Sequence, residues 1–332
     1  MNLTKCMNNS HKPQTWLVTG AAGFIGSHII QELLRNHRVI GFDNLSTGKH
    51  SNLSEVKQIV GAEAWERFTF IEGDIRNPAD VNRAFKHKPD YVLHQAAIGS
   101  VPKSLVDPVT THEVNVTGFL NILQASKASQ VKRVVYASSS AVYGDCISQP
   151  AEVSKIGNTL SPYGLSKRAN ELYAEIQYRC FGLSSTGLRY FNVCGSRQDP
   201  NGDYAAVIPK WIDAMRKNER IYINGDGHTS RDFCPVQNIV QANIKAARLT
   251  TPGSFIFNVA LGNATSLNQL FALLKQYTGY KQDPIYREFR SGDVKFSQAD
   301  ISQTQKIIDY QPSKTFEQGL KETVEWYLSQ PA

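Results

Sequence analysis

A glycine-rich turn between a short strand and a helix constrains the fold of this chain more than any other feature. Residues 16–19, Trp-Leu-Val-Thr, have the composition of a buried strand and lead directly into residues 20–26, Gly-Ala-Ala-Gly-Phe-Ile-Gly. Apolar residues then recur at helical spacing between Phe24 and Leu34. Such a turn presents backbone N–H groups at a helix N-terminus, which suits a pyrophosphate. Because glycines also serve ordinary tight turns, the pattern predicts a dinucleotide site only together with other features.

Strand-like segments continue along the chain at residues 38–42, 68–71, 91–94, 134–137, 186–190 and 255–259. Helical patterns separate those of the first half, and this alternation predicts an α/β fold with a doubly wound parallel Rossmann sheet. Beyond residue 191, turn-rich segments replace the βα units, which predicts a smaller C-terminal substrate-binding lobe. We expect residues 14–191 plus 236–262 to form the dinucleotide-binding domain and residues 192–235 plus 263–330 to form the lobe.

The composition excludes several classes of protein. The 332 residues are 41% hydrophobic and carry a formal net charge of +7 without a long basic run, so we expect a globular protein and no nucleic-acid partner. Five cysteines without a Cys-x-x-Cys pair favour a reducing compartment. Residues 1–15 contain no apolar signal core, and no segment approaches about 18 consecutive apolar residues. We therefore expect a cytoplasmic protein with no membrane span. The eight histidines lack metal-ligand spacing, so no metal site is expected.

Acidic and small residues follow successive predicted strands. Asp43 ends the second strand, where a carboxylate binds ribose hydroxyls and repels a 2′-phosphate, which favours NAD over NADP. Asp74 closes the third strand, at a position suited to an adenine edge, and residues 94–97, His-Gln-Ala-Ala, close the fourth. Each feature alone is more often a simple strand end. Their repetition at successive carboxyl ends is what a ligand lying across a parallel sheet requires.

Tyr163 and Lys167 are four residues apart in a predicted helix and therefore share one face. A tyrosine is a poor base at its usual pKa of about 10, but a nearby ammonium and an oxidised nicotinamide ring would favour its phenolate. Residues 138–140, three serines, close the fifth strand and offer a hydroxyl that can share the substrate's proton. An exposed helix face and a solvated serine turn are the ordinary alternatives. Together with the glycine turn, these residues predict hydride chemistry at a carbon that bears a hydroxyl.

With these residues in hand, the chain resembles the extended short-chain dehydrogenases/reductases, and more narrowly the nucleotide-sugar 4-epimerases that act on UDP-N-acetylhexosamines. The resemblance runs from Thr15 to Trp326 and rests on the strings at residues 96–104, 187–193, 205–210, 222–227, 230–233 and 290–294. It implies a reversible C4 epimerisation of UDP-GlcNAc and UDP-GalNAc with bound NAD. In that mechanism C4 passes a hydride to NAD, the 4-keto sugar turns over, and the hydride returns to its opposite face.

The resemblance also assigns roles to individual residues. Tyr163 is the base, Ser139 belongs to the same hydrogen-bond set, and Lys167 holds the nicotinamide ribose and lowers the pKa of Tyr163. Ser139 is preferred to Ser140 because residues 131–144 align with the family strand without a gap, which leaves Ser140 to face the sugar. The implied cofactor-binding residues are Gly20, Gly23, Phe24, Ile25, Gly26, Asp43, Asn44, Ser46, Gly48, Asp74, Ile75, Gln95, Ala96, Ala97, Asn115, Tyr163, Lys167 and Tyr190.

The substrate-binding residues that the resemblance implies are Gly99, Ser100, Ser139, Ser140, Asn192, Gln198, Ala206, Val207, Lys210, Tyr222, Asn224, Arg231, Arg290, Asp293 and Ser297. Among them, Asn192, Arg231 and Arg290 are expected at the diphosphate, where guanidinium groups bind in bidentate fashion. Tyr222 and Asn224 are expected to flank the uracil, and Asp293 to lie at the ribose. Gly99, Ser100 and Gln198 are expected near the sugar and its 2-substituent. Ser297 stands where galactose-type relatives carry a bulky tyrosine, and a small residue there leaves room for an N-acetyl group.

Several points stay open at this stage. Cys194 and Ser196 replace a Phe and an Arg of close relatives, which leaves the pocket near the sugar uncertain in shape and charge. The pattern is shared by epimerases for UDP-GlcNAcA and UDP-GalNAcA, so C6 is either an alcohol or a carboxylate. A nucleotide-sugar 4,6-dehydratase needs an acid–base pair after the catalytic hydroxyl, and here Ser140 and Ala141 follow instead. A non-catalytic NAD-binding sensor is a further alternative. By analogy with the family, we expect a homodimer.

Overall fold

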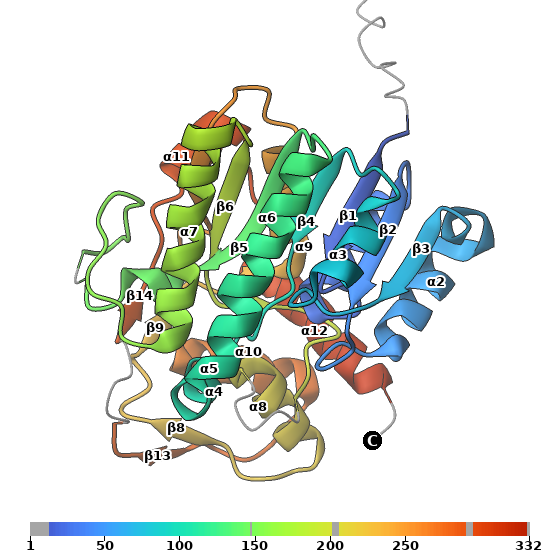
Figure 1. The fold of residues 1–332 in the computed structure, drawn as a ribbon. Helices are drawn as coiled ribbons and strands as arrows, with labels where there is room; N and C mark the ends of the chain where they lie inside the picture. The colour runs from blue at the N-terminus through green and yellow to red at the C-terminus, as the bar shows by residue number, and fades with distance from the viewer. Residues whose placement is uncertain (1–12, 147, 201–205, 290–294, 331–332) are drawn as a thin grey trace, which may run out of the picture.

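The computed structural model describes residues 13–146, 148–200, 206–289 and 295–330 (Figure 1). A seven-stranded parallel sheet lies at its centre, in the order β11-β6-β5-β4-β1-β2-β3. Its strands are β1 (Thr15–Thr19), β2 (Arg38–Asp43), β3 (Phe68–Glu72), β4 (Tyr91–His94), β5 (Arg133–Ser139), β6 (Ser185–Tyr190) and β11 (Ser254–Val259). Each coincides to within two residues with a strand predicted from the sequence, so the doubly wound α/β fold is confirmed.

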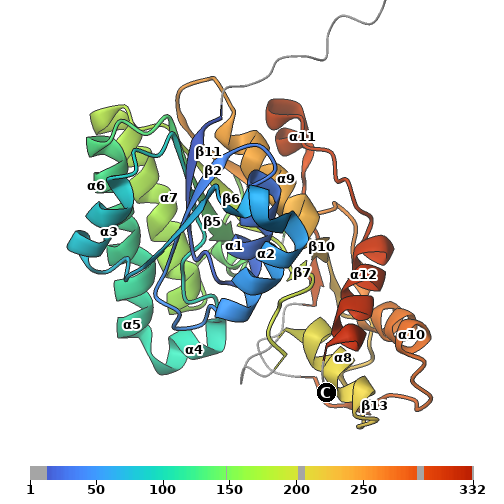
Figure 2. The same cartoon turned by 90° about the vertical axis from the view of Figure 1, so that its right-hand side faces the viewer.

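Helices cover both faces of the sheet, as Figure 2 shows. One layer contains α3 (Pro78–Phe85), α6 (Gly118–Ala128) and α7 (Pro162–Phe181), and the other contains α1 (Phe24–Leu33), α2 (His50–Trp65) and α9 (Val236–Ala247). Each layer has its own hydrophobic cluster, centred on Phe119 and Tyr136 on one side and on Trp16 and Ile29 on the other. Burial on both faces explains why the strands have apolar runs in place of a polar–apolar alternation.

The direction of the strand order reverses at β1, whose neighbours are β2 and β4. In a doubly wound sheet the carboxyl ends of the strands on either side of such a reversal form a crevice. The glycine turn follows β1, and Gln95 follows β4. Ser139 and Tyr190 end the neighbouring strands β5 and β6 and are paired in register. The topology alone therefore brings residues that are far apart in the sequence to one edge of the sheet.

Helix α7 carries Tyr163 and Lys167, and local signals define both of its ends. The Ser161 side chain accepts a hydrogen bond from Gly164 N at the N-terminus, where Pro162 also starts the helix, and Gly182 ends it in the left-handed conformation. A cap of this kind contributes about 1 kcal/mol. The buried face includes Gly164, Lys167 and Glu171. Lys167 therefore points towards the sheet.

A third hydrophobic cluster lies outside the sheet layers. It joins α8 (Val207–Arg216), β8 (Tyr222–Asn224), α10 (Leu267–Thr278) and α12 (Phe316–Ser329). We propose that this cluster is the core of the smaller lobe, with the boundaries expected from the sequence, residues 192–235 plus 263–330, except for one segment. The segment that contains α11 (Ser302–Ile308) packs instead against the sheet, since Ile308 and Tyr310 belong to the cluster around Trp16.

Short strands and turns complete the chain around the crevice. Their bounds are α4 (Val101–Val106), α5 (Pro108–His112), a π-helical turn at Glu113–Thr117, a 3-10 turn at Ser140–Tyr143, β7 (Val193–Cys194), β9 (Ser230–Arg231), β10 (Cys234–Pro235), β12 (Thr265–Ser266), β13 (Ile285–Arg287) and β14 (Phe296–Ser297). Among the described helices, none is long and apolar enough to cross a membrane. The described residues also contain no group of three or more potential metal ligands.

Two buried histidines make the stability of the fold depend on pH. Desolvation lowers the pKa of His28 and of His94 from 6.5 to about 3. The unfolded chain therefore takes up protons on both side chains below about pH 6.5, whereas the folded protein keeps them neutral until about pH 3. The free energy of unfolding must fall as the pH decreases through this window, by up to about 1.4 kcal/mol per pH unit for each histidine.

We expect urea unfolding to show a lower midpoint at pH 5.5 than at pH 7.5. The variants His28→Asn and His94→Asn should each reduce this difference, because one of the two protons is no longer linked to folding. Replacing the exposed His87 by Asn provides the control and should leave the difference unchanged. An unchanged pH dependence in both buried-site variants would contradict the assignment.

Candidate active site

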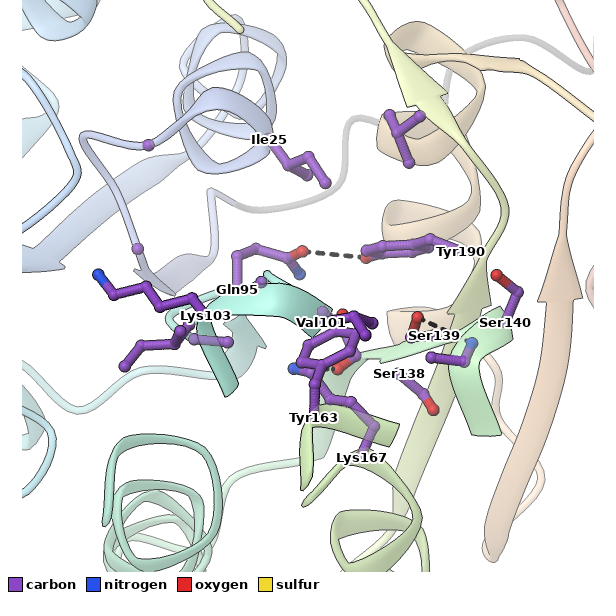
Figure 3. A pocket seen from close by; sticks show the side chains of 18 of the residues that line it. Ile25, Gln95, Val101, Lys103, Ser138, Ser139, Ser140, Tyr163, Lys167 and Tyr190 are labelled. Atoms are coloured by element: carbon purple, nitrogen blue, oxygen red, sulfur yellow. Dashed lines mark hydrogen bonds between the residues drawn. The ribbon is translucent and has the colours of Figure 1, made fainter. Parts of the chain in front are cut away.

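A cavity of about 1260 Å³ lies at the carboxyl edge of the sheet. Its lining combines residues that follow β1 to β6 with residues of the second lobe, among them Arg231 of β9 and Ser297 of β14. Figure 3 shows the part of the cavity around Tyr163, Lys167 and the three serines. A volume of this size accommodates a ligand larger than a typical drug-sized molecule, for which pockets measure about 300–1,000 Å³.

The glycine turn forms one wall of this cavity. Gly20 has φ of +68°, and a Cβ there would lie 2.8 Å from the backbone N of Ala96. A Cβ on Gly26 would lie 2.0 Å from the Gly20 carbonyl oxygen, so both positions require glycine. Gly23 is the N-cap of α1, and no side chain caps the helix there. The first N–H groups of α1 are thus available to a phosphate, and the wall fits the pyrophosphate of a dinucleotide.

Two carboxylates follow the neighbouring strands β2 and β3. Asp43 accepts hydrogen bonds from the backbone N of Ala22 (2.9 Å) and of Leu45 (2.8 Å), while burial raises the pKa of its carboxyl. An ionised carboxylate has about four lone-pair sites, so acceptor capacity remains for a ribose hydroxyl. Asp74 is paired with Arg76 (2.7 Å), whose hydrogen bonds lower the pKa of Asp74 to about 2. The position of Asp43 beside the turn fits NAD, whose ribose keeps a free 2′-hydroxyl.

The three predicted catalytic residues meet in the cavity, as Figure 3 shows. Ser139 ends β5, and its Oγ accepts a hydrogen bond from Ala141 N at 3.1 Å. Lys167 donates from Nζ to the Ala137 carbonyl oxygen at 2.8 Å, which holds α7 against β5. Its Nζ lies 5.9 Å from the centre of the Tyr163 ring. The geometry thus brings a hydroxyl, a phenol and an amine to one surface.

The pKa values of these groups differ from the expectation in one respect. Desolvation raises the pKa of Tyr163, while the Ser139 hydroxyl acts to lower it. Burial lowers the pKa of Lys167 to about 8. The sequence predicts that Lys167 lowers the pKa of Tyr163, but among the protein's own groups desolvation outweighs every other influence. Ser139, and not Lys167, is the residue that opposes it.

A buried ion pair lies near the predicted catalytic residues, on the same helix as Tyr163 and Lys167. Glu171 accepts from Arg189 through Oε1 (2.8 Å) and Oε2 (2.9 Å), and Ser138 donates its Oγ to the same carboxylate at 2.7 Å. Both charged side chains are at most 2% exposed. This network joins α7 to the ends of β5 and β6, beside Ser139 and Tyr190. Sequence reasoning missed Glu171 and Arg189, although Glu171 stands at the next i+4 position after Lys167.

The cavity lining includes most of the predicted site residues. Those present are Gly20, Gly23, Phe24, Ile25, Gly26, Asp43, Asn44, Ser46, Asp74, Ile75, Gln95, Ala96, Ala97, Gly99, Ser139, Ser140, Tyr163, Lys167, Tyr190, Asn192, Gln198, Ala206, Arg231 and Ser297. The lining also contains residues that were not anticipated, such as Arg76, Lys103, Tyr143 and Phe296. They adjoin motifs that the sequence analysis recognised, since Arg76 is two residues after Asp74 and Phe296 directly precedes Ser297, but no role was assigned to them.

Other predicted residues lie elsewhere. Gly48, Ser100, Asn115, Val207, Lys210, Tyr222 and Asn224 are not part of the lining, and Arg290 and Asp293 lie outside the described residues. Asn115 holds the cavity wall indirectly, since it accepts from Ile98 N (2.8 Å) and donates to Ser166 (3.0 Å). Ser100 caps α4 through Lys103 N. The Arg287 guanidinium lies 3.3 Å from the centre of the Tyr222 ring. The binding roles assigned to all these residues stay predictions.

Comparison with known proteins identifies the family. The sequence profile of the NAD dependent epimerase/dehydratase family matches residues 16–260. A putative UDP-glucose 4-epimerase of Methanocaldococcus jannaschii is 37% identical over 93% of this chain and 97% of its own. The UDP-N-acetylglucosamine 4-epimerase of Methanobrevibacter ruminantium, solved with UDP-N-acetylmuramic acid, is 40% identical, with a TM-score of 0.89 over 96% of this chain and 100% of its own.

A further solved structure contains the cofactor. The UDP-glucuronic acid 4-epimerase of Bacillus cereus, in complex with UDP-glucuronic acid and NAD, is 28% identical, with a TM-score of 0.83 over 94% of this chain and 98% of its own. The chain belongs to the NAD-dependent epimerase/dehydratase family. It is an NAD-dependent epimerase, and the predicted NAD cofactor is confirmed. The glycine turn and Asp43 are the residues that fit this cofactor.

The site predicts separate effects for its phenol and its hydroxyl. Tyr163→Phe should reduce turnover by about a thousandfold, because general-base catalysis contributes about 10²–10⁴-fold.

Ser139→Ala should shift the acid limb of the kcat/KM profile to higher pH, because the hydroxyl that lowers the pKa of Tyr163 is removed. Steady-state rates between pH 5 and 10 measure both effects. Tyr173→Phe, on the exposed side of α7, is the matched control and should retain wild-type rates. An acid limb that Ser139→Ala leaves in place contradicts this role.

Proposed function

We propose that the protein interconverts UDP-N-acetylglucosamine and UDP-N-acetylgalactosamine by inverting the configuration at C4. The observation that carries this proposal is the meeting of Ser139, Tyr163 and Lys167 with Arg231 and Ser297 in one cavity. The first three supply the chemistry of an alcohol oxidation, and the other two come from the lobe that faces the sheet. The UDP-sugar 4-epimerases among its relatives support the same reaction class.

The chain's own residues divide the proton chemistry among them. Tyr163 takes the proton of the sugar's 4-hydroxyl and later returns it, and Ser139 shares the hydrogen bond to that oxygen. Lys167 holds the cofactor ribose from the buried face of α7. Bound NAD supplies the hydride acceptor and donor, so that C4 passes through a 4-keto state and the cofactor ends as it began.

The diphosphate of the substrate is assigned to Arg231 and Asn192. Asp232, which follows Arg231, supports this position because its carboxylate accepts from the backbone N of Leu261 (2.9 Å), Gly262 (3.0 Å) and Ala299 (3.2 Å). Asn192 donates from Nδ2 to the Asp232 carbonyl oxygen at 3.1 Å. These bonds fix the backbone that carries both phosphate ligands. A guanidinium and an amide held in this way suit a diphosphate.

Ser297 supports the N-acetylated substrate. It is paired in register with Arg231, and both line the cavity. A side chain at position 297 therefore lies beside the residue assigned to the diphosphate. A hydroxymethyl side chain leaves the adjoining volume to the 2-substituent of the sugar, whereas a tyrosine would fill it.

An epimerase for the corresponding uronates, UDP-GlcNAcA and UDP-GalNAcA, is the second candidate. The Bacillus cereus enzyme acts on UDP-glucuronic acid, and Ser140 supplies the cavity lining with a hydroxyl that can donate to a carboxylate. A dehydratase is disfavoured because Ser140 and Ala141 supply no acid–base pair. A non-catalytic sensor is disfavoured because the Tyr163–Lys167 pair is retained.

We also propose a cytoplasmic location. It is supported by the free thiols of Cys146, Cys180, Cys194 and Cys234.

We also propose a homodimer that forms through α7. Its outer face exposes the apolar stripe Leu165, Leu172, Tyr173 and Ile176, each at least 40% exposed. Residues at i, i+7 and i+11 lie on one side of a helix, so the stripe is continuous. Exposed apolar patches of this kind mark interfaces, and a two-fold axis lets one patch cover its own copy.

The substrate assignment can be tested by proton NMR of purified protein without added NAD. UDP-GlcNAc, UDP-GalNAc, UDP-Glc and UDP-GlcNAcA are supplied separately, and we expect interconversion of the N-acetylated pair. Ser297→Tyr should abolish turnover of that pair and keep UDP-Glc turnover, whereas the control Ser297→Ala should keep both. Faster turnover of the uronate would transfer the assignment to the second candidate, and a 4-keto-6-deoxy product would overturn epimerisation.

The dimer proposal predicts a mass twice that of one chain in sedimentation velocity. Leu172→Glu combined with Ile176→Glu should halve it, because two charges would be buried in the interface. Ile59→Glu, an exposed apolar position on α2, is the control and should remain dimeric. A wild-type protein that sediments as one chain at micromolar concentration contradicts the proposal.

A further inference from the structure

Three polar side chains from three elements form a closed ring of hydrogen bonds beside the cavity. Tyr190 donates its hydroxyl to Gln95 Oε1 at 3.0 Å, Gln95 donates from Nε2 to Asn243 Oδ1 at 3.0 Å, and Asn243 donates from Nδ2 to the Tyr190 hydroxyl at 2.7 Å. Figure 3 shows the bond between Gln95 and Tyr190. We refer to these residues as the Gln95–Tyr190–Asn243 ring. Sequence reasoning selected Gln95 and Tyr190 and missed Asn243.

The direction of these hydrogen bonds is set from the backbone of α9. Asn243 Nδ2 also donates to the Ile239 carbonyl oxygen at 2.8 Å. Because that carbonyl only accepts, the nitrogen of the Asn243 amide must face it, and Oδ1 must then receive the Gln95 amide. Gln95 Oε1 is left to accept from Tyr190. The single proton of the Tyr190 hydroxyl is therefore committed to Gln95.

The ring separates a buried residue from two that face the ligand. Gln95 and Tyr190 line the cavity, whereas Asn243 is fully buried and is not part of the lining. It therefore acts on the cavity through the other two residues. Loss of Asn243 would leave Gln95 without its acceptor and Tyr190 without its donor, and either group could then satisfy itself by turning towards the ligand.

Tyr190 lines the catalytic cavity together with two other phenols, Tyr163 and Tyr143. Desolvation raises its pKa well above the usual value. The titratable groups that act on it are Cys234 at the start of β10 and Tyr163, and burial raises the pKa of both, so that neither contributes a charge near neutral pH in the protein by itself. Tyr190 therefore keeps its proton near neutral pH and donates it in the hydrogen bond to Gln95 Oε1. Tyr143 likewise donates its hydroxyl to Asn258 Oδ1 at 2.6 Å. Among the phenols of the described lining, this leaves Tyr163 to exchange a proton with the substrate.

We propose that Asn243 is a positioning residue for the epimerase reaction: through the Gln95–Tyr190–Asn243 ring it fixes the two side chains that border the cofactor and reserves proton transfer for Tyr163. This inference deepens the role of the catalytic cavity and rests on the NAD-dependent chemistry, not on the identity of the sugar. It assigns to α9, which carries no residue of the cavity lining, an influence on turnover through Gln95 and Tyr190.

The test compares Asn243→Leu, Tyr190→Phe and the double variant with a matched control. Asn238→Leu is that control, because Asn238 is also fully buried on α9 but bonds to residues 313 and 314 instead of the cavity. Each protein is purified with its bound NAD. The measurements are NAD content per chain, kcat and KM with the sugar nucleotide that the wild type turns over, and thermal stability.

We expect Asn243→Leu to lower kcat by about ten- to a hundredfold with KM within about twofold, since misplacement by about 1 Å costs up to about a hundredfold. The double variant should be no slower than Asn243→Leu, because the residues act as one unit. Asn238→Leu should lose stability and keep both kcat and NAD. Wild-type kcat and NAD content in Asn243→Leu would overturn the inference, as would additive losses in the double variant. NAD content needs no sugar, so it tests the inference even if every candidate substrate fails.

Discussion

The buried pair between Glu171 and Arg189 is the contact on which the arrangement of the site depends. It joins the helix that carries Tyr163 and Lys167 to the ends of β5 and β6, which carry Ser139 and Tyr190. Removal of one partner of a buried pair costs about 3–5 kcal/mol, because the other charge remains buried. Here the Ser138 hydroxyl and Arg168 also bond to the carboxylate, so its lone pairs are largely satisfied. These bonds therefore fix the position of α7 relative to the sheet. The positions of Tyr163 and Lys167 are fixed with it.

Within this frame, burial and hydrogen bonding act in opposite directions on the reacting groups. Burial raises the pKa of Tyr163 and lowers that of Lys167 to about 8, so the protein by itself holds both groups closer to their neutral forms. A cofactor with a positively charged ring acts in the opposite sense on the phenol. The Tyr163 phenol therefore acts as a base when the oxidised cofactor is bound. Tyr190, whose proton is committed to Gln95, does not share this response.

The sequence predicts the parts of this protein that depend on local backbone requirements. Gly20 needs a positive φ and Gly26 needs close backbone approach, and both demands are visible as glycines at fixed spacing. Tyr163 and Lys167 are likewise related by one helical turn. Glu171, Arg189 and Asn243 could not be assigned in the same way. Glu171 and Arg189 are 18 residues apart, and Asn243 is 53 residues from Tyr190 and 148 from Gln95. Their roles follow from strand order, which periodicity does not specify. The rise in the pKa of Tyr163 could not be predicted for a similar reason, since desolvation is a property of the assembled cavity. The effect of Lys167 on Tyr163 in the NAD-bound protein stays a prediction.

The central claim is that C4 is oxidised and reduced within one closed site by the same cofactor molecule. It is tested most directly with a UDP-sugar that carries deuterium at C4, incubated with the purified protein in ordinary water without added NAD. The account predicts that the epimerised product retains deuterium at C4, because the label leaves as hydride and returns to the same carbon. Replacement of the label by solvent hydrogen would contradict the account, since it would show that C4 is inverted by proton exchange and not by transient oxidation.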